Sequence, residues 1–182
     1  MPLQSGAETI IDRWFVENRL IKPPDFTRQV EIFHDLILSW SSRMNLISKN
    51  DLNQLLERHI LDSLAPLHSI PETGRLLDIG SGGGFPGIPL ALCRPEMSVV
   101  LLESRHKKIL FLKEVCRRLA LGNVTFEEIR LENFYPSMPF DIVTVRALPG
   151  WEKFLKKAKS LVSADGRIIY YKKAGMIEFI SP

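Results

Sequence analysis

A run of glycines between two apolar segments is the feature that most constrains how this chain can fold. Residues 76–90 read LLDIGSGGGFPGIPL, so an apolar segment that includes Asp78 meets five glycines within eight residues and then resumes. Glycine is favoured where the backbone adopts a positive φ or where a ligand lies against the main chain. The pattern predicts a buried strand, a tight turn and the start of a helix. The exposed N–H groups of the turn and of the first helical turn would form a polar cradle for a nucleotide-like ligand, with Gly80 and Gly82 among the residues that contact it.

Two kinds of ligand fit such a turn. The spacing Gly82-x-Gly84-x-x-Gly87 is that of a dinucleotide-binding fingerprint, so an NAD-dependent oxidoreductase is one hypothesis. Asp78 favours S-adenosylmethionine instead, because a carboxylate at the end of the strand attracts a cationic amino-acid group and repels a pyrophosphate. Phe85 adds an apolar wall that suits a sulfonium and an adenosine. The chain also shows no second domain to hold the substrate of an oxidoreductase.

From residue 75 onwards, short apolar runs alternate with helical patterns, which is typical of an α/β domain with a mostly parallel sheet. Strands are expected near 75–79, 98–103, 124–129, 141–146 and 167–172, and helices near 86–93, 105–121 and 151–163. Ligands of such sheets bind at the carboxyl ends of the strands, so the residues that follow each strand are the candidate ligand contacts.

Four residues at these strand ends are candidate cofactor contacts. Glu103 follows the second strand, where an acidic residue binds ribose hydroxyls. Leu131 and Glu132 follow the third strand and could frame an adenine, with an apolar contact for the ring and an acceptor for the amine. Arg146 ends an otherwise apolar strand, and because an unpaired buried charge is costly, we expect it to face the cleft and meet a carboxylate or a phosphate.

The residues before the glycine turn are predicted to form a helical extension over 1–70, ahead of an α/β domain over 71–182. Helical periodicity runs over 5–21, 25–44 and 51–68. In the third of these segments, Arg58 and Asp62 are spaced to form an i, i+4 ion pair. Arg58 and His59 are also candidates for contact with RNA phosphates or the mouth of the cofactor site.

Composition and charge restrict the partners and the compartment. The 182 residues carry a net charge of +3, which permits a nucleic-acid partner without requiring one. Basic side chains gather on two predicted helices, where Lys107 and Lys108 are candidate RNA contacts. Cys93 and Cys116 lie inside predicted helices without metal-ligand spacing, so we expect buried thiols and no metal. Neither a membrane span nor a signal sequence is recognisable, so a soluble cytoplasmic protein is expected.

Four segments of the chain resemble one protein family. They are RHILDSL at 58–64, DIGSGGGFPGIPL at 78–90, RPE at 94–96 and VRA at 145–147. In this order they closely resemble the bacterial small-subunit rRNA guanine-N7 methyltransferases, the RsmG or glucose-inhibited division protein B family, and the likeness runs to about Lys173. The resemblance implies a Rossmann-like methyltransferase domain behind a helical extension. It also implies S-adenosylmethionine as cofactor, N7 of one guanine in 16S rRNA as methyl acceptor, and 16S rRNA or the small ribosomal subunit as partner. Separately from the resemblance, we expect a monomer.

The resemblance further implies which residues line the cofactor site: Gly80 and Phe85 in the turn, Leu131 and Glu132 in the third loop, and Arg146 after the fourth strand. Family members usually carry leucine or a similar apolar residue where Phe85 stands. No catalytic residue is expected, because guanine N7 has a free lone pair and needs no general base.

The end of the chain departs from the family pattern. The family continues past the fifth strand with a helix and a closing antiparallel strand pair, whereas this chain ends at Pro182. We therefore expect the C-terminal strands to be missing and the fifth strand to form an unprotected sheet edge. A catalytically impaired homologue that only binds RNA or cofactor is the alternative function.

Overall fold

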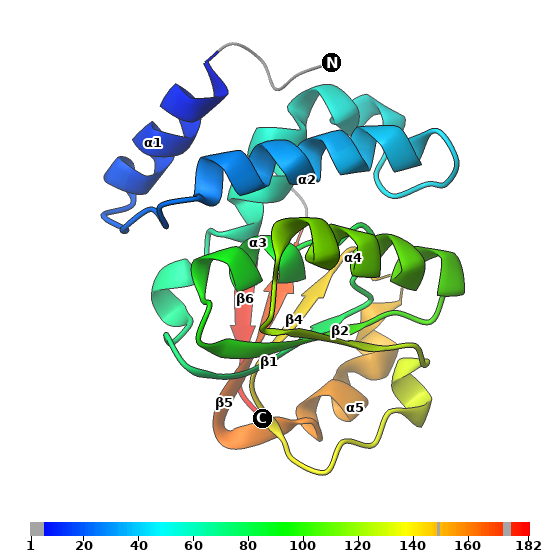
Figure 1. Cartoon of the computed structure of the whole chain (residues 1–182). Coiled ribbons are helices and arrows are strands. Elements are labelled where there is room, and N and C mark those ends of the chain that lie inside the picture. The colour runs from blue at the N-terminus through cyan, green and yellow to red at the C-terminus, as the bar shows by residue number, and fades with distance from the viewer. Residues whose placement is uncertain (1–5, 149, 173–175) are drawn as a thin grey trace.

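The structure is a computed structural model that describes residues 6–148, 150–172 and 176–182. Residue 5, where the first helix is predicted to begin, and Lys173, where the family likeness ends, lie outside these ranges. The elements form layers, with α1 and α2 stacked above α3 and α4, which cover one face of a sheet whose other face is covered by α5 (Figure 1). This is the α/β architecture that the alternating pattern predicts.

The sheet has six strands in the order β3-β2-β1-β4-β5-β6, and the first five run parallel. Their bounds are β1 Gly74–Ile79, β2 Met97–Leu102, β3 Val124–Glu127, β4 Phe140–Arg146, β5 Val162–Tyr171 and β6 Ile177–Ile180. Successive side chains of a strand point to opposite faces, so Leu76 packs beneath α3 and α4 while Leu77 packs toward α5. Both faces of the central strands are therefore buried.

The last strand corrects one expectation from the sequence. β6 pairs antiparallel with β5, with Ile168 opposite Ile180 and Tyr171 opposite Ile177. β5 is thus not the edge of the sheet, and the chain retains one antiparallel strand at its C-terminal end. The expectation of an unprotected fifth strand was wrong because the stretch before Pro182 is long enough to return along β5 and satisfy its backbone groups.

Most helices lie where the periodicity predicts them. They are α1 Ala7–Glu17, α2 Phe26–Ser41, α3 Gly87–Cys93, α4 His106–Leu119 and α5 Leu155–Lys159. The helix expected over 151–163 is shorter, because a 3₁₀ turn occupies Trp151–Phe154 and β5 already begins at Val162. None of the helices in the described ranges combines the length and apolar character of a bilayer span. Cys93 and Cys116 are both buried free thiols, as predicted, and burial raises the pKa of each to about 12.

The segment 51–68 is not the single α-helix that its periodicity suggests. It contains a 3₁₀ helix at Lys49–Gln54, a π-helix at Leu56–Leu61 and a further 3₁₀ turn at Leu67–Ser69. Its buried apolar residues repeat at a spacing of five, as Leu55 with Ile60 and Leu56 with Leu61. A π-helix bonds residue i to residue i+5, so it keeps both pairs on the buried side where an α-helix would not.

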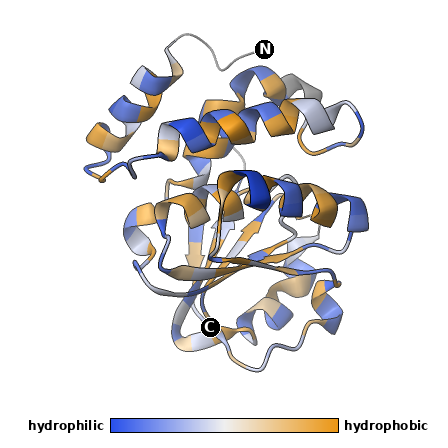
Figure 2. Cartoon of the chain, in the orientation of Figure 1, coloured by the Kyte–Doolittle hydropathy of each residue, from blue (hydrophilic) through white to orange (hydrophobic). Residues whose placement is uncertain are grey.

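One apolar core joins the N-terminal helices to the upper face of the sheet. Its members come from α1, α2, the π-helical segment, α3, α4 and alternate residues of the strands. In Figure 2, α2 and α4 carry both orange and blue bands, as helices with one buried and one exposed side should. Phe33 of α2 is fully buried, and its ring lies 5.1 Å from that of Phe85 in the glycine turn. This contact fixes the helical extension directly against the turn.

We expect Phe33→Ala to destabilise the chain by about 3–5 kcal/mol, because it removes a buried ring and leaves a cavity between α2 and the turn. Urea unfolding followed by circular dichroism measures the change. Val16→Ala on α1 is the control, since Val16 is 75% exposed and its truncation should stay within about 0.5 kcal/mol. Equal effects of the two variants would contradict this packing.

Candidate active site

The glycine turn has the strand–turn–helix form that the sequence predicts. β1 ends at Ile79, and α3 begins at Gly87. Gly84 has a φ of +91°, and a Cβ there would lie 2.8 Å from the Ile88 side chain and 3.2 Å from Phe33. Another residue type would therefore meet both an unfavourable backbone conformation and the packed wall of the core. The turn remains open on the opposite side, toward the carboxyl ends of the strands.

Asp78 lies beneath the turn and is fully buried. Its carboxylate accepts hydrogen bonds from the Thr144 hydroxyl at 2.9 Å and from the Gly87 N–H at 3.2 Å, so it joins β1, β4 and the start of α3. Burial raises the pKa of Asp78 to about 6, although these hydrogen bonds oppose the shift. Asp78 lines neither of the two cavities described below, and its direct contact with a ligand stays a prediction.

Glu103 lies at the carboxyl end of β2, as the sequence predicts. Its carboxylate accepts hydrogen bonds from the Gly82 N–H at 3.1 Å and from the Arg105 N–H at 2.9 Å. Two main-chain donors thus hold this carboxylate in one orientation beside the turn, where it lines a cavity.

This first cavity, of about 420 Å³, lies over the carboxyl ends of the strands. It brings together four residues that the sequence selects from three separate loops, namely Gly80, Glu103, Leu131 and Glu132. Leu131 is nearly buried and Glu132 is exposed, so the cavity has an apolar wall beside a carboxylate at its rim. The volume is in the range of small-molecule sites.

A second cavity of about 650 Å³ adjoins the first and shares Gly80, Lys108 and Ala147 with it. One side is formed by the glycine turn, Phe85 and Arg146, and the other by residues of the helical extension, which are Asn45, Leu46, Ile47, Ser48, Asp51 and His59. Nothing in the sequence marks the segment 45–51 as part of a site, because a polar linker ahead of a short helix has no signal that separates it from an ordinary surface loop.

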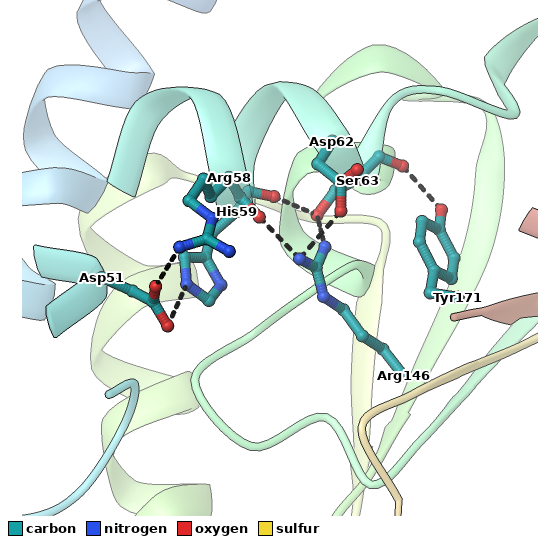
Figure 3. Close-up of polar contacts among 7 residues, drawn as sticks. All are labelled: Asp51, Arg58, His59, Asp62, Ser63, Arg146 and Tyr171. Atoms are coloured by element: carbon teal, nitrogen blue, oxygen red, sulfur yellow. Dashed lines mark hydrogen bonds and ion pairs between the residues drawn. The ribbon is translucent and has the colours of Figure 1, made fainter. Parts of the chain in front are cut away.

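Arg146 connects the end of β4 with the π-helical segment (Figure 3). Its guanidinium forms an ion pair with Asp62 at 2.8 Å, donates to the Arg58 carbonyl at 2.6 Å and lies over the Tyr171 ring. The Tyr171 hydroxyl in turn donates to the Ser63 carbonyl at 2.6 Å. The carboxylate that Arg146 meets belongs to the chain itself, and the expected contact of Arg146 with a ligand stays a prediction.

This arrangement corrects the expected ion pair between Arg58 and Asp62. Asp62 is bound by Arg146, while Arg58 pairs with Asp51 at 2.9 Å. The π-helical winding accounts for the difference, because it changes the angular spacing of residues four apart and turns Asp62 toward the strand ends.

His59 contributes an uncharged ring to the second cavity. The ring lies 5.2 Å from that of Phe85, measured between centroids. Burial, together with the nearby Arg146 guanidinium, lowers the pKa of His59 to about 4, so the imidazole is neutral at pH 7. Its Nε2 atom is buried and has no hydrogen-bond partner in the described part of the chain, with the Asp51 carboxylate 3.7 Å away.

The two lysines proposed for RNA contact have different surroundings. Lys108 on α4 is half-buried and lines both cavities, and burial lowers its pKa. Lys107 is exposed and lines neither cavity. Within the described ranges, no cluster of three or more His, Cys, Asp or Glu side chains is arranged to hold a metal ion.

Solved methyltransferase structures share the fold described above. Coclaurine N-methyltransferase bound to N-methylheliamine and SAH aligns with 90% of this chain and 58% of its own, at a TM-score of 0.57 and 17% identity. Precorrin-6y C5,15-methyltransferase from Geobacter metallireducens GS-15 aligns with 69% of this chain and 64% of its own, at a TM-score of 0.54 and 20% identity. The chain therefore has the Rossmann-like fold of these methyltransferases.

Sequence comparison narrows this class to one family. The GidB family, described as rRNA small subunit methyltransferase G, matches residues 27–179, and the chain belongs to it. The ribosomal RNA small subunit methyltransferase G of Shewanella woodyi is 38% identical over 168 residues, which are 92% of this chain and 80% of that protein. That of Chromobacterium violaceum is 38% identical over 137 residues, 75% of this chain and 66% of that protein. The chain thus spans about two thirds of the length of several of the curated relatives it matches. The resemblance noted in the sequence is confirmed.

Asp78 should make stability depend on pH in a window between about pH 4 and 6. Its pKa rises from an ordinary 3.8 to about 6 on folding, so the folded chain binds the proton more tightly than the unfolded chain. Protonation of Asp78 in the folded chain therefore stabilises the fold fully below pH 4, and this stabilisation is lost as the pH rises to 6. We expect the stability of the wild type relative to Asp78→Asn to fall by about 2–3 kcal/mol between pH 4 and pH 7. Urea unfolding of both chains across this range measures it, and parallel pH profiles would show that Asp78 does not titrate as described.

The Arg146–Asp62 pair should couple the helical extension to the sheet. The two side chains are 16% and 20% exposed, so solvent screens them only in part. In a double-mutant cycle with Arg146→Gln and Asp62→Asn, we expect a coupling free energy of about 1–3 kcal/mol. Denaturant unfolding of the four chains measures this coupling.

The exposed Arg117–Glu114 pair on α4 provides the matched cycle and should give a smaller coupling, because it lies in water. Additive effects of the Arg146 and Asp62 substitutions would mean that their contact does not stabilise the fold.

Proposed function

We propose that this chain is an S-adenosylmethionine-dependent methyltransferase that modifies N7 of a guanine in small-subunit rRNA. The observation that carries the proposal is the convergence of the glycine turn, Glu103 and the Leu131 loop on one cavity, with a second cavity beside it, in a chain of this family. The names of its relatives supply the substrate class, ribosomal RNA of the small subunit.

The residues of the first cavity fit the adenosine half of S-adenosylmethionine. The Glu103 carboxylate is already oriented by two N–H groups and has capacity to accept from ribose hydroxyls. Leu131 offers an apolar surface to the adenine, and Glu132 lies beside it. Gly80 and Gly82 would lie against the rest of the cofactor, and the Phe85 and Arg146 side chains border the adjoining second cavity, where the amino-acid part would extend.

The cofactor supplies an electrophilic methyl group, and guanine N7 supplies an unprotonated lone pair at neutral pH. This chain therefore needs to provide neither a general base nor a metal. Its residues bind and orient the two reactants and keep water away, and such positioning contributes up to about 7–11 kcal/mol in well-oriented systems. The neutral His59 is suited to this role, because it adds no cation beside a cationic cofactor.

The partner and compartment belong to the same proposal. We assign 16S rRNA or an assembling small-subunit particle as the substrate of a monomer acting in the cytoplasm. A base inside a duplex or a folded particle must be accessible to enter the second cavity, so a flipped or unpaired guanine is expected.

Isothermal titration should show binding of S-adenosylmethionine to the wild-type chain, and Glu103→Gln should weaken it about tenfold because a charge-assisted acceptor is lost. Glu31→Gln, on the exposed side of α2, is the matched control and should bind as the wild type does. Binding of NAD in place of S-adenosylmethionine would reject the proposal.

Transfer of labelled methyl groups to small-subunit rRNA, free and in 30S particles, tests the activity itself. Label that survives as N7-methylguanosine after digestion supports the proposal. Tight cofactor binding without any labelled RNA would instead favour the alternative, an RNA- or cofactor-binding module.

A further inference from the structure

One wall of the second cavity has no function in cofactor binding as proposed above. It is the wall that the helical extension provides, with the Asp51 carboxylate and the His59 ring facing the space beside the glycine turn. Arg146 and Lys108 supply the cationic side chains of this cavity, whereas Asp51 is the carboxylate among its described lining residues. The two walls therefore differ in hydrogen-bonding character.

Contacts within the chain orient the Asp51 side chain. The Arg58 guanidinium forms an ion pair with one oxygen at 2.9 Å, and His59 Nε2 lies 3.7 Å from the other (Figure 3). The main-chain N–H of Asp51 donates to the Ser48 carbonyl at 3.0 Å. A carboxylate has about four lone-pair sites, so the contacts with Arg58 and His59 leave acceptor capacity toward the cavity. Asp51 is thus an oriented hydrogen-bond acceptor.

His59 gives a second indication of a ligand. Its Nε2 atom is buried and makes no hydrogen bond within the described part of the chain, with the Asp51 carboxylate 3.7 Å away, although buried polar atoms are nearly always bonded in folded chains. The neutral ring lies against Phe85, so the two rings form an aromatic surface in the same cavity as Asp51. A planar polar group with donors along one edge would complement both features.

We propose that Asp51 determines the base specificity of this site by accepting hydrogen bonds from N1–H and the exocyclic amino group of guanine. This assignment rests on the proposed function. Guanine carries acceptors, N7 and O6, on one edge and these two donors on the opposite edge, whereas adenine has an acceptor at N1. Asp51 would therefore favour guanine over adenine and direct N7 away from itself, toward the glycine turn.

The direct test uses mononucleotides and the chain loaded with S-adenosylhomocysteine, titrated by NMR. Inosine monophosphate lacks the exocyclic amino group of guanosine monophosphate but keeps N1–H, O6 and N7. We expect the wild type to bind guanosine monophosphate about fivefold or more tightly than inosine monophosphate, as for a good bidentate contact. In Asp51→Asn this ratio should fall to about one, with the affinity for S-adenosylhomocysteine changed less than about twofold.

Two control variants separate recognition from structure. Asp165→Asn, an exposed aspartate in the amino-terminal half of β5, should keep both affinities of the wild type. Arg58→Gln removes the ion pair but leaves the carboxylate, so it should keep a clear preference for guanosine monophosphate. A loss of preference in Arg58→Gln as complete as in Asp51→Asn would overturn the assignment. The preference for guanosine monophosphate would then depend on the Arg58–Asp51 ion pair and not on the carboxylate itself.

Other outcomes also decide the question. Equal binding of the two mononucleotides by the wild type overturns the proposal even if Asp51→Asn fails to fold. A collapse of S-adenosylhomocysteine affinity in a folded Asp51→Asn assigns Asp51 to the cofactor. Failure of the wild type to bind S-adenosylhomocysteine, or to label rRNA, is a failure of the proposed function and is read out before any mononucleotide is added.

Discussion

A buried carboxylate beneath the glycine turn is the interaction on which the rest of the site depends. Asp78 accepts hydrogen bonds from the Gly87 N–H at the start of α3 and from the Thr144 hydroxyl on β4. One side chain thus joins β1, α3 and β4. A Cβ at Gly87 would lie 2.8 Å from this carboxylate, which shows how closely the backbone of α3 approaches β1. Because the fixed backbone directs the turn toward the strand ends, Glu103 can bond the Gly82 N–H and complete the first cavity.

The helical extension is an integral part of the second cavity. The buried contact of Phe33 with Phe85 places α2 against the turn, and Arg146 attaches the π-helical segment to the end of β4. Between these two attachments, Asp51 and His59 face the glycine turn across the second cavity. The sheet thus provides the surfaces proposed for the cofactor, while the extension closes the opposite side.

The sequence predicted those features that depend on local pattern. Hydrophobic alternation and the glycine run were sufficient for the parallel strands, the turn and the positions of Glu103, Leu131, Glu132 and Arg146, because strand ends converge in any parallel sheet. Partners across the fold could not be predicted in this way. The pairing of Arg146 with Asp62, the bond from Thr144 to Asp78 and the contribution of Asp51 all join residues far apart in the chain or from different layers. β6 was missed because a four-residue strand at a chain end has too little pattern to separate it from a tail.

The π-helical winding at Leu56–Leu61 makes the register of this segment as important as its composition. A π-helical turn holds about one residue more than an α-helical turn, which advances about 100° per residue. Winding the same residues as an α-helix would therefore rotate everything after them by roughly that angle, and Asp62 and Ser63 would swing away from Arg146 and Tyr171, although no side chain of the site had been altered. Deleting one residue while restoring α-helical winding would instead leave Asp62 and Ser63 facing the strand ends, so the wide turn accommodates one extra residue without moving the contacts that close this side of the cavity.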